Sequence, residues 1–260
     1  MMDFANKVIV ITGGASGIGR AAALSFAHGG ATVIVVDLNL DGARETISRC
    51  GGGEAHRLNV ADEAAWEELC ADILTRHGRF DGLINCAGIG RAGNFEELSL
   101  ADWTAMLDVN LTGVFLGCKH AVRTMRKAGN GGSIVNVSSI AGLVGGDDIA
   151  GYCGSKGGVT TLSKAVALHC TRYKTGIRCN SVHPTYVDSE MLDPVAALFE
   201  SRQAMLDGMA EAVPIGRVAV PQDIANAILF LSSDAASMIT GIALPVDGGQ
   251  LAGIPSKHTT

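Results

Sequence analysis

The chain has 260 residues, of which 47% are hydrophobic, and its formal net charge is −6. This apolar content is enough for one sizeable core, and α/β chains of this length often fold as a single domain. Charges of both signs are spread along the chain without a Lys/Arg block, which argues against a nucleic-acid-binding or polybasic membrane surface.

Five apolar runs rich in β-branched residues recur along the chain. Their apolar residues are consecutive and do not alternate, which is typical of parallel strands covered on both faces. The predicted strands lie at 7–12, 31–37, 82–88, 132–139 and 177–182, with a further C-terminal strand within 241–249. Helical patterns lie between the strands, so the sequence predicts one α/β domain over residues 1–260 with a doubly wound parallel sheet.

Start and stop signals mark several of these helices. The pattern at 17–30 ends in two glycines, that at 62–78 ends at Gly78, and that at 99–110 opens with Ser99 and Asp102 in capping-box spacing. Further helices are predicted over 152–170 and 221–233.

The segment 184–220 is irregular and lies between the last core strand and the helix at 221–233. Its middle has helical spacing, with Met and Leu residues in positions that suggest exposure. We interpret residues 186–213 as a mobile substrate lid over a binding cleft, with an ordinary surface helical hairpin as the alternative.

Two further features of the sequence indicate the cellular compartment of the protein. The seven cysteines are scattered without a CxxC pair, which suits reduced thiols in the cytosol and does not match zinc-ligand spacing. The N-terminal apolar run is too short for a signal peptide or a membrane span. We therefore expect a cytoplasmic protein without a membrane partner.

Three glycines, Gly13, Gly17 and Gly19, join the first strand to the first helix. Side chains at these positions would block a pyrophosphate from the helix N-terminus, where backbone N–H groups and the helix dipole bind anions. The alternative is a tight turn, but the strand before the loop and the helix after it favour dinucleotide binding.

Asp37 follows 18 residues later, at the end of the second strand. Its carboxylate can accept hydrogen bonds from a ribose 2′-hydroxyl and would repel a 2′-phosphate. Ser16 and Leu38, where a basic residue could meet that phosphate, are uncharged. These residues predict NAD over NADP as the cofactor, with a simple turn aspartate as the alternative.

Several motifs in order resemble the short-chain dehydrogenase/reductase family. They are Thr12-Gly13-x-x-x-Gly17-x-Gly19, "NCAG" at 85–88, Asn110, "SS" at 138–139, Tyr152-x-x-x-Lys156, "RCNSVHP" at 178–184 and "TGIALPVDGG" at 240–249. The resemblance extends from about Lys7 to Gly249. It implies a Rossmann-type fold and an oxidoreductase function.

The resemblance assigns roles to individual residues. Tyr152 is expected to be the general acid/base, and Lys156 to bind the nicotinamide ribose and lower the tyrosine pKa. Ser139 is expected to hydrogen-bond the substrate oxygen, and Asn110 to hold a water in a proton relay. The predicted cofactor-binding residues are Gly13, Ser16, Gly17, Ile18, Gly19, Asp37, Leu38, Asn59, Val60, Asn85, Ala87, Gly88, Tyr152, Lys156, Pro184, Val187 and Ser189.

The chemistry supports these roles independently of the family. A free tyrosine has a pKa of about 10 and is a poor base at neutral pH. A nearby ammonium and the positive nicotinamide ring both favour phenolate. Each unit by which the pKa is lowered corresponds to about 1.4 kcal/mol. Ser139 fits the family spacing better than Ser138, which remains the alternative serine.

The chain departs from the family pattern at three positions. Asn59 stands where an aspartate near the adenine is usual, Thr185 follows Pro184 where glycine is common, and Ser189 replaces a threonine that touches the carboxamide. Asn59 and Ser189 can still make the expected hydrogen bonds. With Thr185 in place of glycine, the sequence does not determine the backbone conformation before the lid. No metal cluster is predicted among the seven histidines.

These residues predict an NAD-dependent alcohol dehydrogenase/ketone reductase. The segments expected to line the substrate cleft, 140–150 and the lid, are mostly apolar and hold no basic cluster, which favours a neutral hydrophobic secondary alcohol that is alicyclic, steroid-like or aryl. The predicted substrate residues are Ile140, Val144, Ile149, Tyr186, Met191 and Phe199, with Met205 and Met209 as further lid candidates. The alternatives are a 3-oxoacyl thioester reductase and a non-catalytic dinucleotide-binding sensor.

The resemblance also implies a homotetramer. Two apolar surfaces would serve as its interfaces: the outer face of the helix at 152–170, which has few charges, and the C-terminal strand within 241–249, which would pack across a two-fold axis.

Overall fold

The chain forms a seven-stranded, entirely parallel sheet in the order β3-β2-β1-β4-β5-β6-β7, which confirms the predicted doubly wound class. The computed structural model describes residues 2–253, so residues 1 and 254–260 of the predicted domain lie outside the described residues. The strands are β1 Val8–Thr12, β2 Thr32–Asp37, β3 Glu54–Arg57, β4 Gly82–Asn85, β5 Gly132–Val137, β6 Ile177–Pro184 and β7 Ala243–Val246.

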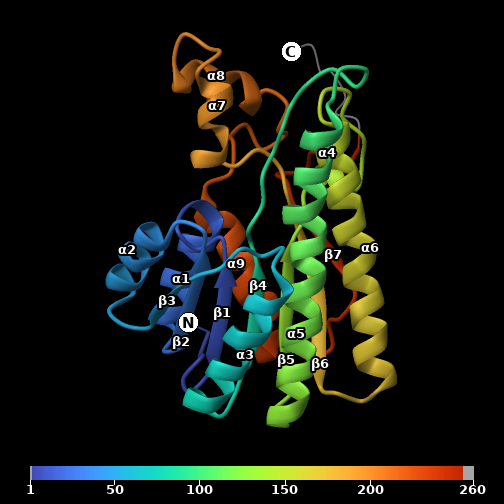
Figure 1. Cartoon of the computed structure of the whole chain (residues 1–260). Coiled ribbons are helices and arrows are strands. Elements are labelled where there is room, and N and C mark those ends of the chain that lie inside the picture. The colour runs from blue at the N-terminus through green and yellow to red at the C-terminus, as the bar shows by residue number, and fades with distance from the viewer. Residues whose placement is uncertain (1, 254–260) are drawn as a thin grey trace.

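Helices cover both faces of this sheet (Figure 1). One face is covered by α1 Gly17–His28, α2 Leu40–Cys50 and α9 Pro221–Ser232. The other is covered by α3 Glu63–His77, α5 Gly113–Ala128 and α6 Ala150–Arg172, and the short α4 Leu100–Leu107 packs against α6.

The β1 strand shows why the apolar residues in the strands are consecutive. Val8 and Val10 face the core under α3, α5 and α6, whereas Ile9 and Ile11 face the core under α1 and α9. Successive strand residues point to opposite faces, so a sheet buried on both sides needs an apolar residue at every position. Each fully buried side chain of this size stabilises the fold by about 1.5–3 kcal/mol.

Several sequence signals at the helix ends are confirmed. The Ser99 hydroxyl caps α4 by accepting from the Asp102 N–H at 3.0 Å. Gly78 ends α3 in the left-handed conformation, with φ 66°. The predicted helix at 99–110 differs, because α4 ends at Leu107 and continues as a π-helical turn over Asp108–Thr112.

The segment after β6 is helical, as its spacing predicted. A 3₁₀ turn at Glu190–Leu192 is followed by α7 Asp193–Ala196 and α8 Arg202–Ala210. These helices lie at the top of Figure 1, beyond the carboxyl end of β6. Within residues 2–253, no helix has both the length and the apolar composition needed to cross a membrane.

Candidate active site

The predicted site residues gather at the carboxyl ends of β1, β4, β5 and β6. The strand order reverses between β1 and β4, and in open α/β sheets this switch point is where ligands bind. The glycine loop leaves β1 there, the 85–88 segment leaves β4, and Ser139 lies two residues beyond β5.

The glycine loop has a shape that only glycine allows. Gly13 and Gly17 have φ angles of 65° and 47°. A Cβ at Gly13 would lie 2.7 Å from the Ala87 backbone, and one at Gly19 would lie 2.2 Å from the Gly13 carbonyl oxygen. The loop is therefore packed tightly against the 85–88 segment and against itself, and a side chain at Gly13 or Gly19 would force it to move. Ser16 and Ile18 flank Gly17 in this loop.

Two side chains hold the loop in place. The Thr12 hydroxyl oxygen accepts from the Cys86 and Ala87 N–H groups, both at 3.1 Å. The Asp37 carboxylate accepts from the Ala15 N–H at 3.0 Å and from the Asn39 N–H at 2.9 Å. Asp37 therefore has the turn role considered as its alternative, and its carboxylate also lies directly beside the glycine loop. Leu38 is exposed.

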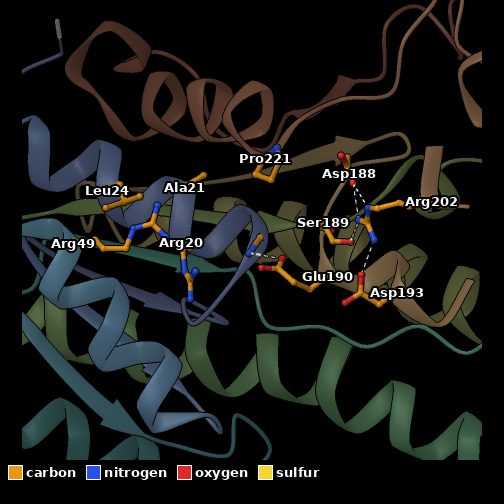
Figure 2. Close-up of a pocket in the computed structure, with 11 residues that line it drawn as sticks. Arg20, Ala21, Leu24, Arg49, Asp188, Ser189, Glu190, Asp193, Arg202 and Pro221 are labelled. Atoms are coloured by element: carbon orange, nitrogen blue, oxygen red, sulfur yellow. Dashed lines mark hydrogen bonds and ion pairs between the residues drawn. The ribbon is translucent and has the colours of Figure 1, made fainter. Parts of the chain in front are cut away.

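A contact that the sequence did not predict joins the lid to this loop. The Gly17 N–H donates to a Glu190 carboxylate oxygen at 3.0 Å (Figure 2). Arg202 braces the same part of the lid, because its guanidinium donates to Asp188 and Asp193 and to the Ser189 carbonyl oxygen at 2.8 Å. An anion bound at the Gly17 N–H must displace Glu190.

Tyr152 and Lys156 lie one turn apart on the first part of α6. Lys156 is buried, and its Nζ donates to the Val137 carbonyl oxygen at 2.9 Å. The same Nζ lies 5.5 Å from the centroid of the Tyr152 ring. The lysine is thus fixed between β5 and the tyrosine. This arrangement differs from that of a tyrosine and a lysine that are neighbours by chance at the surface.

Burial shifts the pKa values of these two groups in opposite directions. It raises the pKa of Tyr152 to about 12, although a hydrogen bond with the Ser139 side chain opposes the shift. It lowers the pKa of Lys156 to about 8. In the free chain desolvation of the phenolate dominates the pKa of Tyr152. A lowering of the tyrosine pKa by Lys156 stays a prediction for the cofactor-bound enzyme.

The two candidate serines have different environments. Ser138 is buried, and its hydroxyl donates to the Lys156 carbonyl oxygen at 2.9 Å, so it ties β5 to α6. Ser139 is partly exposed, caps a short 3₁₀ turn at Ile140–Gly142, and its side chain acts to lower the pKa of Tyr152. The geometry favours Ser139 over Ser138 as the partner of Tyr152.

Asn110 lies in the π-helical turn after α4 and is fully buried. Its amide donates to the Ile89 carbonyl at 2.9 Å and to the Ser155 hydroxyl at 3.0 Å, and its Oδ1 accepts from the Ile89 N–H at 2.8 Å. Ser155 in turn donates to the Tyr152 carbonyl at 2.8 Å. The side chain of Asn110 thus links the backbone of Ile89 to the first turn of α6 through Ser155.

The remaining cofactor residues surround this centre. A Cβ at Gly88 would lie 3.4 Å from Lys156 Nζ and 3.3 Å from Asn110 Oδ1, so glycine leaves room for both. Asn85 lies behind this wall, because its buried amide donates to Asn136 at 2.8 Å. Asn59 is exposed and Val60 is buried.

The residues after β6 approach the glycine loop from the other side. Ser189 lies against Gly17, where an added Cβ would be 3.4 Å from the Ser189 Cβ. Val187 is buried and pairs with Ala219 through an isolated bridge, and Pro184 ends β6. Thr185 is not among the described residues with positive φ, so this backbone position does not need the glycine that is usual there.

Most of the predicted substrate residues have exposed side-chain surface. Val144, Tyr186, Met191 and Phe199 are exposed, and Ile140 and Ile149 are partly exposed. Met205 differs from the expectation for the lid, because it is fully buried. It lies on the buried face of α8 and is a packing residue.

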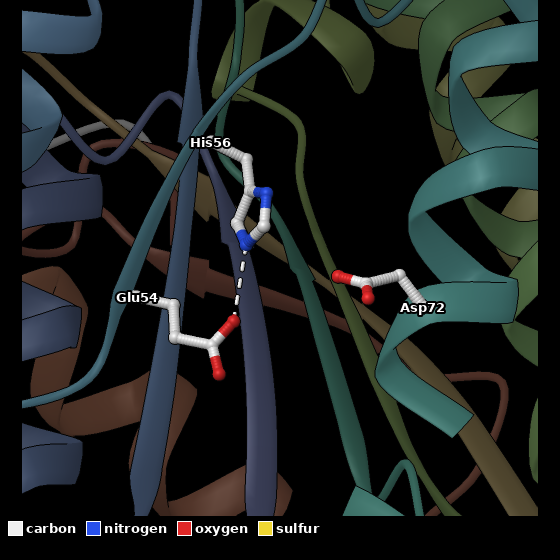
Figure 3. A group of neighbouring side chains, drawn as sticks. All are labelled: Glu54, His56 and Asp72. Carbon is white, nitrogen blue, oxygen red and sulfur yellow. Dashed lines mark hydrogen bonds and ion pairs between the residues drawn. The ribbon is translucent and has the colours of Figure 1, made fainter. Parts of the chain in front are cut away.

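Two groups of potential metal ligands come together that the sequence did not predict. Figure 3 shows one of them, Glu54 and His56 of β3 with Asp72 of α3. The Arg76 guanidinium bonds both carboxylates. Hydrogen bonds from His56 and His77 hold the pKa of Glu54 below its ordinary value even though burial opposes this. A bound arginine thus already balances the charge of the cluster.

The second group, Glu63 and Glu67 of α3 with His120 of α5, is also paired with a cation. Lys119 bonds Glu63 directly, and His120 Nε2 lies 3.2 Å from the same carboxylate.

The chain matches a family model described as enoyl-(acyl carrier protein) reductase over residues 13–250. This model is one of the short-chain dehydrogenase/reductase models. The chain belongs to the short-chain dehydrogenase/reductase family. Membership implies an oxidoreductase with a nicotinamide dinucleotide cofactor. A short-chain dehydrogenase/reductase from Mycobacterium marinum has the same fold, with a TM-score of 0.89 and 30% identity over 96% of this chain and 98% of that one.

Curated relatives are similar along nearly their whole length. A 2,5-dichloro-2,5-cyclohexadiene-1,4-diol dehydrogenase of Sphingobium indicum is 41% identical, covering 96% of this chain and 98% of the relative. A D-threitol dehydrogenase of Mycolicibacterium smegmatis is 41% identical (94% and 92%), and a cyclohexanol dehydrogenase of an Acinetobacter species is 40% identical (94% and 95%). An NADP-dependent (R)-specific alcohol dehydrogenase of Lentilactobacillus kefiri is 34% identical (95% and 97%).

Proposed function

We propose that this chain is an NAD(H)-dependent enzyme that interconverts a neutral hydrophobic secondary alcohol and its ketone, with Tyr152 as the acid/base. The observation that supports this most directly is the assembly of Ser139, Tyr152 and the buried Lys156 at one end of the sheet, near the glycine loop that opens α1.

The loop fits a dinucleotide. Glycines at 13 and 19 let the loop fold tightly at the start of α1, and the N-terminus of a helix suits a pyrophosphate. Asp37, beside the loop, offers its carboxylate to a ribose, and Lys156 and Ser189 would contact the nicotinamide half. When bound, the nicotinamide supplies the acceptor or donor of the hydride.

The side chains would supply the proton chemistry. During alcohol oxidation Tyr152 would take the hydroxyl proton, while the Ser139 hydroxyl would orient the substrate oxygen next to the phenol. Lys156 would hold the ribose and favour phenolate by its charge. Asn110 would keep the first turn of α6 in place through Ser155 and hold a relay water.

The surface near the site favours an apolar substrate. Val144 in the segment after β5, and Met191 and Phe199 in the lid, expose apolar side chains. In the lid, Arg202 is bound to Asp188 and Asp193 and is not free to hold an anionic substrate. The names of two relatives, a cyclohexanol dehydrogenase and a chlorinated cyclohexadienediol dehydrogenase, agree with an alicyclic alcohol, whereas the D-threitol dehydrogenase keeps a polyol in the test.

Two other functions remain as candidates. One is a 3-oxoacyl thioester reductase. The matching family model is described as an acyl thioester reductase of another kind, so a thioester substrate is included in the function test. A non-catalytic dinucleotide sensor would not need Ser139, Tyr152 and Lys156 together.

The function test compares the wild type and Tyr152→Phe in NAD⁺ reduction with cyclohexanol, a steroid alcohol, an aryl alcohol, a polyol and a 3-hydroxyacyl thioester. We expect the highest kcat/KM with a cyclic, steroid or aryl alcohol. Tyr152→Phe keeps the bulk of the ring but removes the proton carrier, so turnover should fall by about 10²–10⁴-fold. NAD⁺ affinity, measured by calorimetry, should change little.

Each outcome of this test discriminates. Preference for the polyol or the thioester would overturn the substrate assignment. NAD⁺ binding without turnover of any alcohol would favour the sensor. Near-normal turnover in Tyr152→Phe would remove Tyr152 from the proposed chemistry.

The choice of cofactor is expected to depend on Asp37. The wild type should prefer NAD⁺ strongly, because a carboxylate and a 2′-phosphate at this position repel each other. Asp37→Ala combined with Leu38→Arg should shift the kcat/KM ratio toward NADP⁺. Since Asp37 also accepts from the Ala15 N–H, Asp37→Asn with Leu38→Arg is the matched variant that keeps an acceptor for the loop. Equal wild-type efficiency with both cofactors would contradict the proposal.

A further inference from the structure

His183 is a buried titratable residue that the proposed chemistry does not use. It lies on β6 and is fully inaccessible to solvent. Its Nδ1 lies 2.8 Å from the carbonyl oxygen of Ser139, and its Nε2 lies 2.8 Å from the hydroxyl of Ser181. Both ring nitrogens are therefore paired, and one of the partners is the backbone of the site serine.

The place of this contact in the sheet is informative. The backbone pairing of β5 with β6 ends at Val137 and Val182, and its last hydrogen bond runs from the Ser138 N–H to the Val182 carbonyl at 2.9 Å. Ser139 is the next residue, beyond the reach of this ladder. The imidazole of His183 supplies a donor from β6 to Ser139 that the β6 backbone does not supply.

The two partners also fix the tautomer of the ring. A carbonyl oxygen only accepts, so Nδ1 must hold a proton and donate to Ser139. Nε2 then has a lone pair and accepts from the Ser181 hydroxyl. Burial, together with the nearby charges of Lys156 and Lys164, keeps the pKa of His183 below its ordinary value despite the bond to Ser139, which favours this neutral form.

The Ser139 carbonyl has a second donor, the Gly142 N–H at 2.9 Å, and the Ser139 hydroxyl oxygen accepts from the Ala141 N–H at 3.1 Å. These two bonds belong to the 3₁₀ turn that follows Ser139. Within the described residues, His183 therefore adds the side-chain link that holds this turn to the neighbouring strand.

We propose that His183 is a positioning residue that holds the Ser139 backbone through its Nδ1–H and so places the Ser139 hydroxyl against Tyr152. The proposal rests on the proposed function of Ser139 and Tyr152. Loss of this bond leaves the turn attached only through its own hydrogen bonds, and a displacement of about 1 Å at a reacting group can cost up to about 10²-fold in rate.

The test uses two substitutions of His183 that differ in whether the new side chain can donate a hydrogen bond to the Ser139 carbonyl. His183→Asn keeps an N–H at the same number of bonds from the backbone as Nδ1, whereas His183→Leu has similar bulk and no donor. We expect His183→Leu to lower kcat by about 10- to 100-fold, with NAD⁺ affinity unchanged within about twofold. His183→Asn should recover most of the rate. The rising limb of the pH–kcat profile for alcohol oxidation should move to higher pH in His183→Leu, because the Ser139 hydrogen bond that lowers the Tyr152 pKa is weakened.

The matched control is His120 of α5, another buried histidine, whose ring pairs with Glu63 of α3. His120→Leu and His120→Asn should change thermal stability. The two variants should have the same kcat as each other and the same pH profile as the wild type. Equal kcat and pH profiles for His183→Leu and the wild type, in protein of normal melting temperature, would overturn the proposal. So would equal losses in His183→Leu and His183→Asn.

Nuclear magnetic resonance of ¹⁵N-histidine-labelled, cofactor-free protein gives a readout that does not need turnover. We expect one imidazole, lost in His183→Asn, with a protonated Nδ1 and an unprotonated Nε2. The opposite tautomer would overturn the hydrogen bond to Ser139 itself. A wild type with this tautomer but no turnover on any alcohol would instead refute the proposed function, and with it a role of His183 in that chemistry.

Discussion

Tyr152 and Lys156 show how burial and geometry act on single residues. A phenol and an ammonium on one helical turn suggest mutual stabilisation, yet the ammonium bonds the Val137 carbonyl and lies over the ring. Desolvation therefore governs both groups: the tyrosine pKa rises to about 12 and the lysine pKa falls to about 8. In the free chain the phenol is protonated at neutral pH, which suits an acid for ketone reduction.

The direction of the pH dependence follows from this. Alcohol oxidation needs the phenolate, so kcat should rise by about tenfold per pH unit below the apparent pKa of the complex. The positive nicotinamide ring should bring that apparent pKa below the value of about 12 in the free chain. Ketone reduction needs the phenol and should be flat over the same range and fall above it. Steady-state rates in both directions across pH test this.

Ser139→Ala is the control for the assignment. The Ser139 hydrogen bond lowers the Tyr152 pKa, so its loss should move the rising limb of oxidation to higher pH. Oxidation that is independent of pH in the wild type would show that Tyr152 is not the base.

At the scale of elements, the apolar pattern predicted the strands that are buried on both faces and missed the edge strand that is fixed by polar contacts. β1, β2 and β5 are apolar runs covered on both faces and were predicted within one or two residues. β3 was missed because its sequence, EAHR, has one apolar residue. It is an edge strand fixed by pairing with β2 and by the contacts of Glu54 with α3.

Site residues were predictable where a local motif determines them and not where the fold brings distant residues together. The glycine loop and the Tyr152–Lys156 spacing are local. The contact of Glu190 with Gly17 joins residues 173 positions apart, and that of His183 with Ser139 spans 44 positions. The inward direction of Met205 depends on how α8 packs, which a run of apolar residues does not specify.

The glycine loop gives a prediction at this scale. In Gly19→Ala the new Cβ would lie 2.2 Å from the Gly13 carbonyl oxygen, so the loop must move. We expect the free energy of unfolding to fall by ~1–3 kcal/mol, as for other overpacked sites. NAD⁺ affinity should fall by about tenfold or more, because the displaced backbone no longer presents its N–H groups correctly. Denaturant unfolding and calorimetry measure the two effects.

Gly208→Ala on α8 is the matched control. Gly208 is exposed and has nothing within 4 Å of an added Cβ. Alanine there should slightly stabilise the helix, by up to about 1 kcal/mol, and leave NAD⁺ binding unchanged. Normal NAD⁺ affinity in Gly19→Ala would mean that this loop does not bind the cofactor.

At the scale of the whole molecule, the two predicted assembly surfaces retain exposed apolar groups. On α6, Leu168 is 72% exposed, and in the segment 241–249 Ile242 is 41% exposed. Large contiguous apolar surface is uncommon on a monomer and often marks an interface. Lys164 and Arg172 on α6 show that this surface is not wholly apolar, so association there would be tuned by charge as well as by burial.

We therefore expect a homotetramer in solution, with one interface through α6 and the other near β7. Leu168→Asp and Ile242→Asp each place a charge in one predicted interface, where desolvation of an unpaired carboxylate is costly. Each substitution alone should reduce the mass measured by light scattering from four chains to two, and the double variant should give single chains. Leu198→Asp in the lid, at a side chain 82% exposed and outside both surfaces, is the control and should leave the mass unchanged. A wild-type mass of one chain at micromolar concentration would contradict the assembly. Dissociation by Leu198→Asp alone would move the interface to the lid.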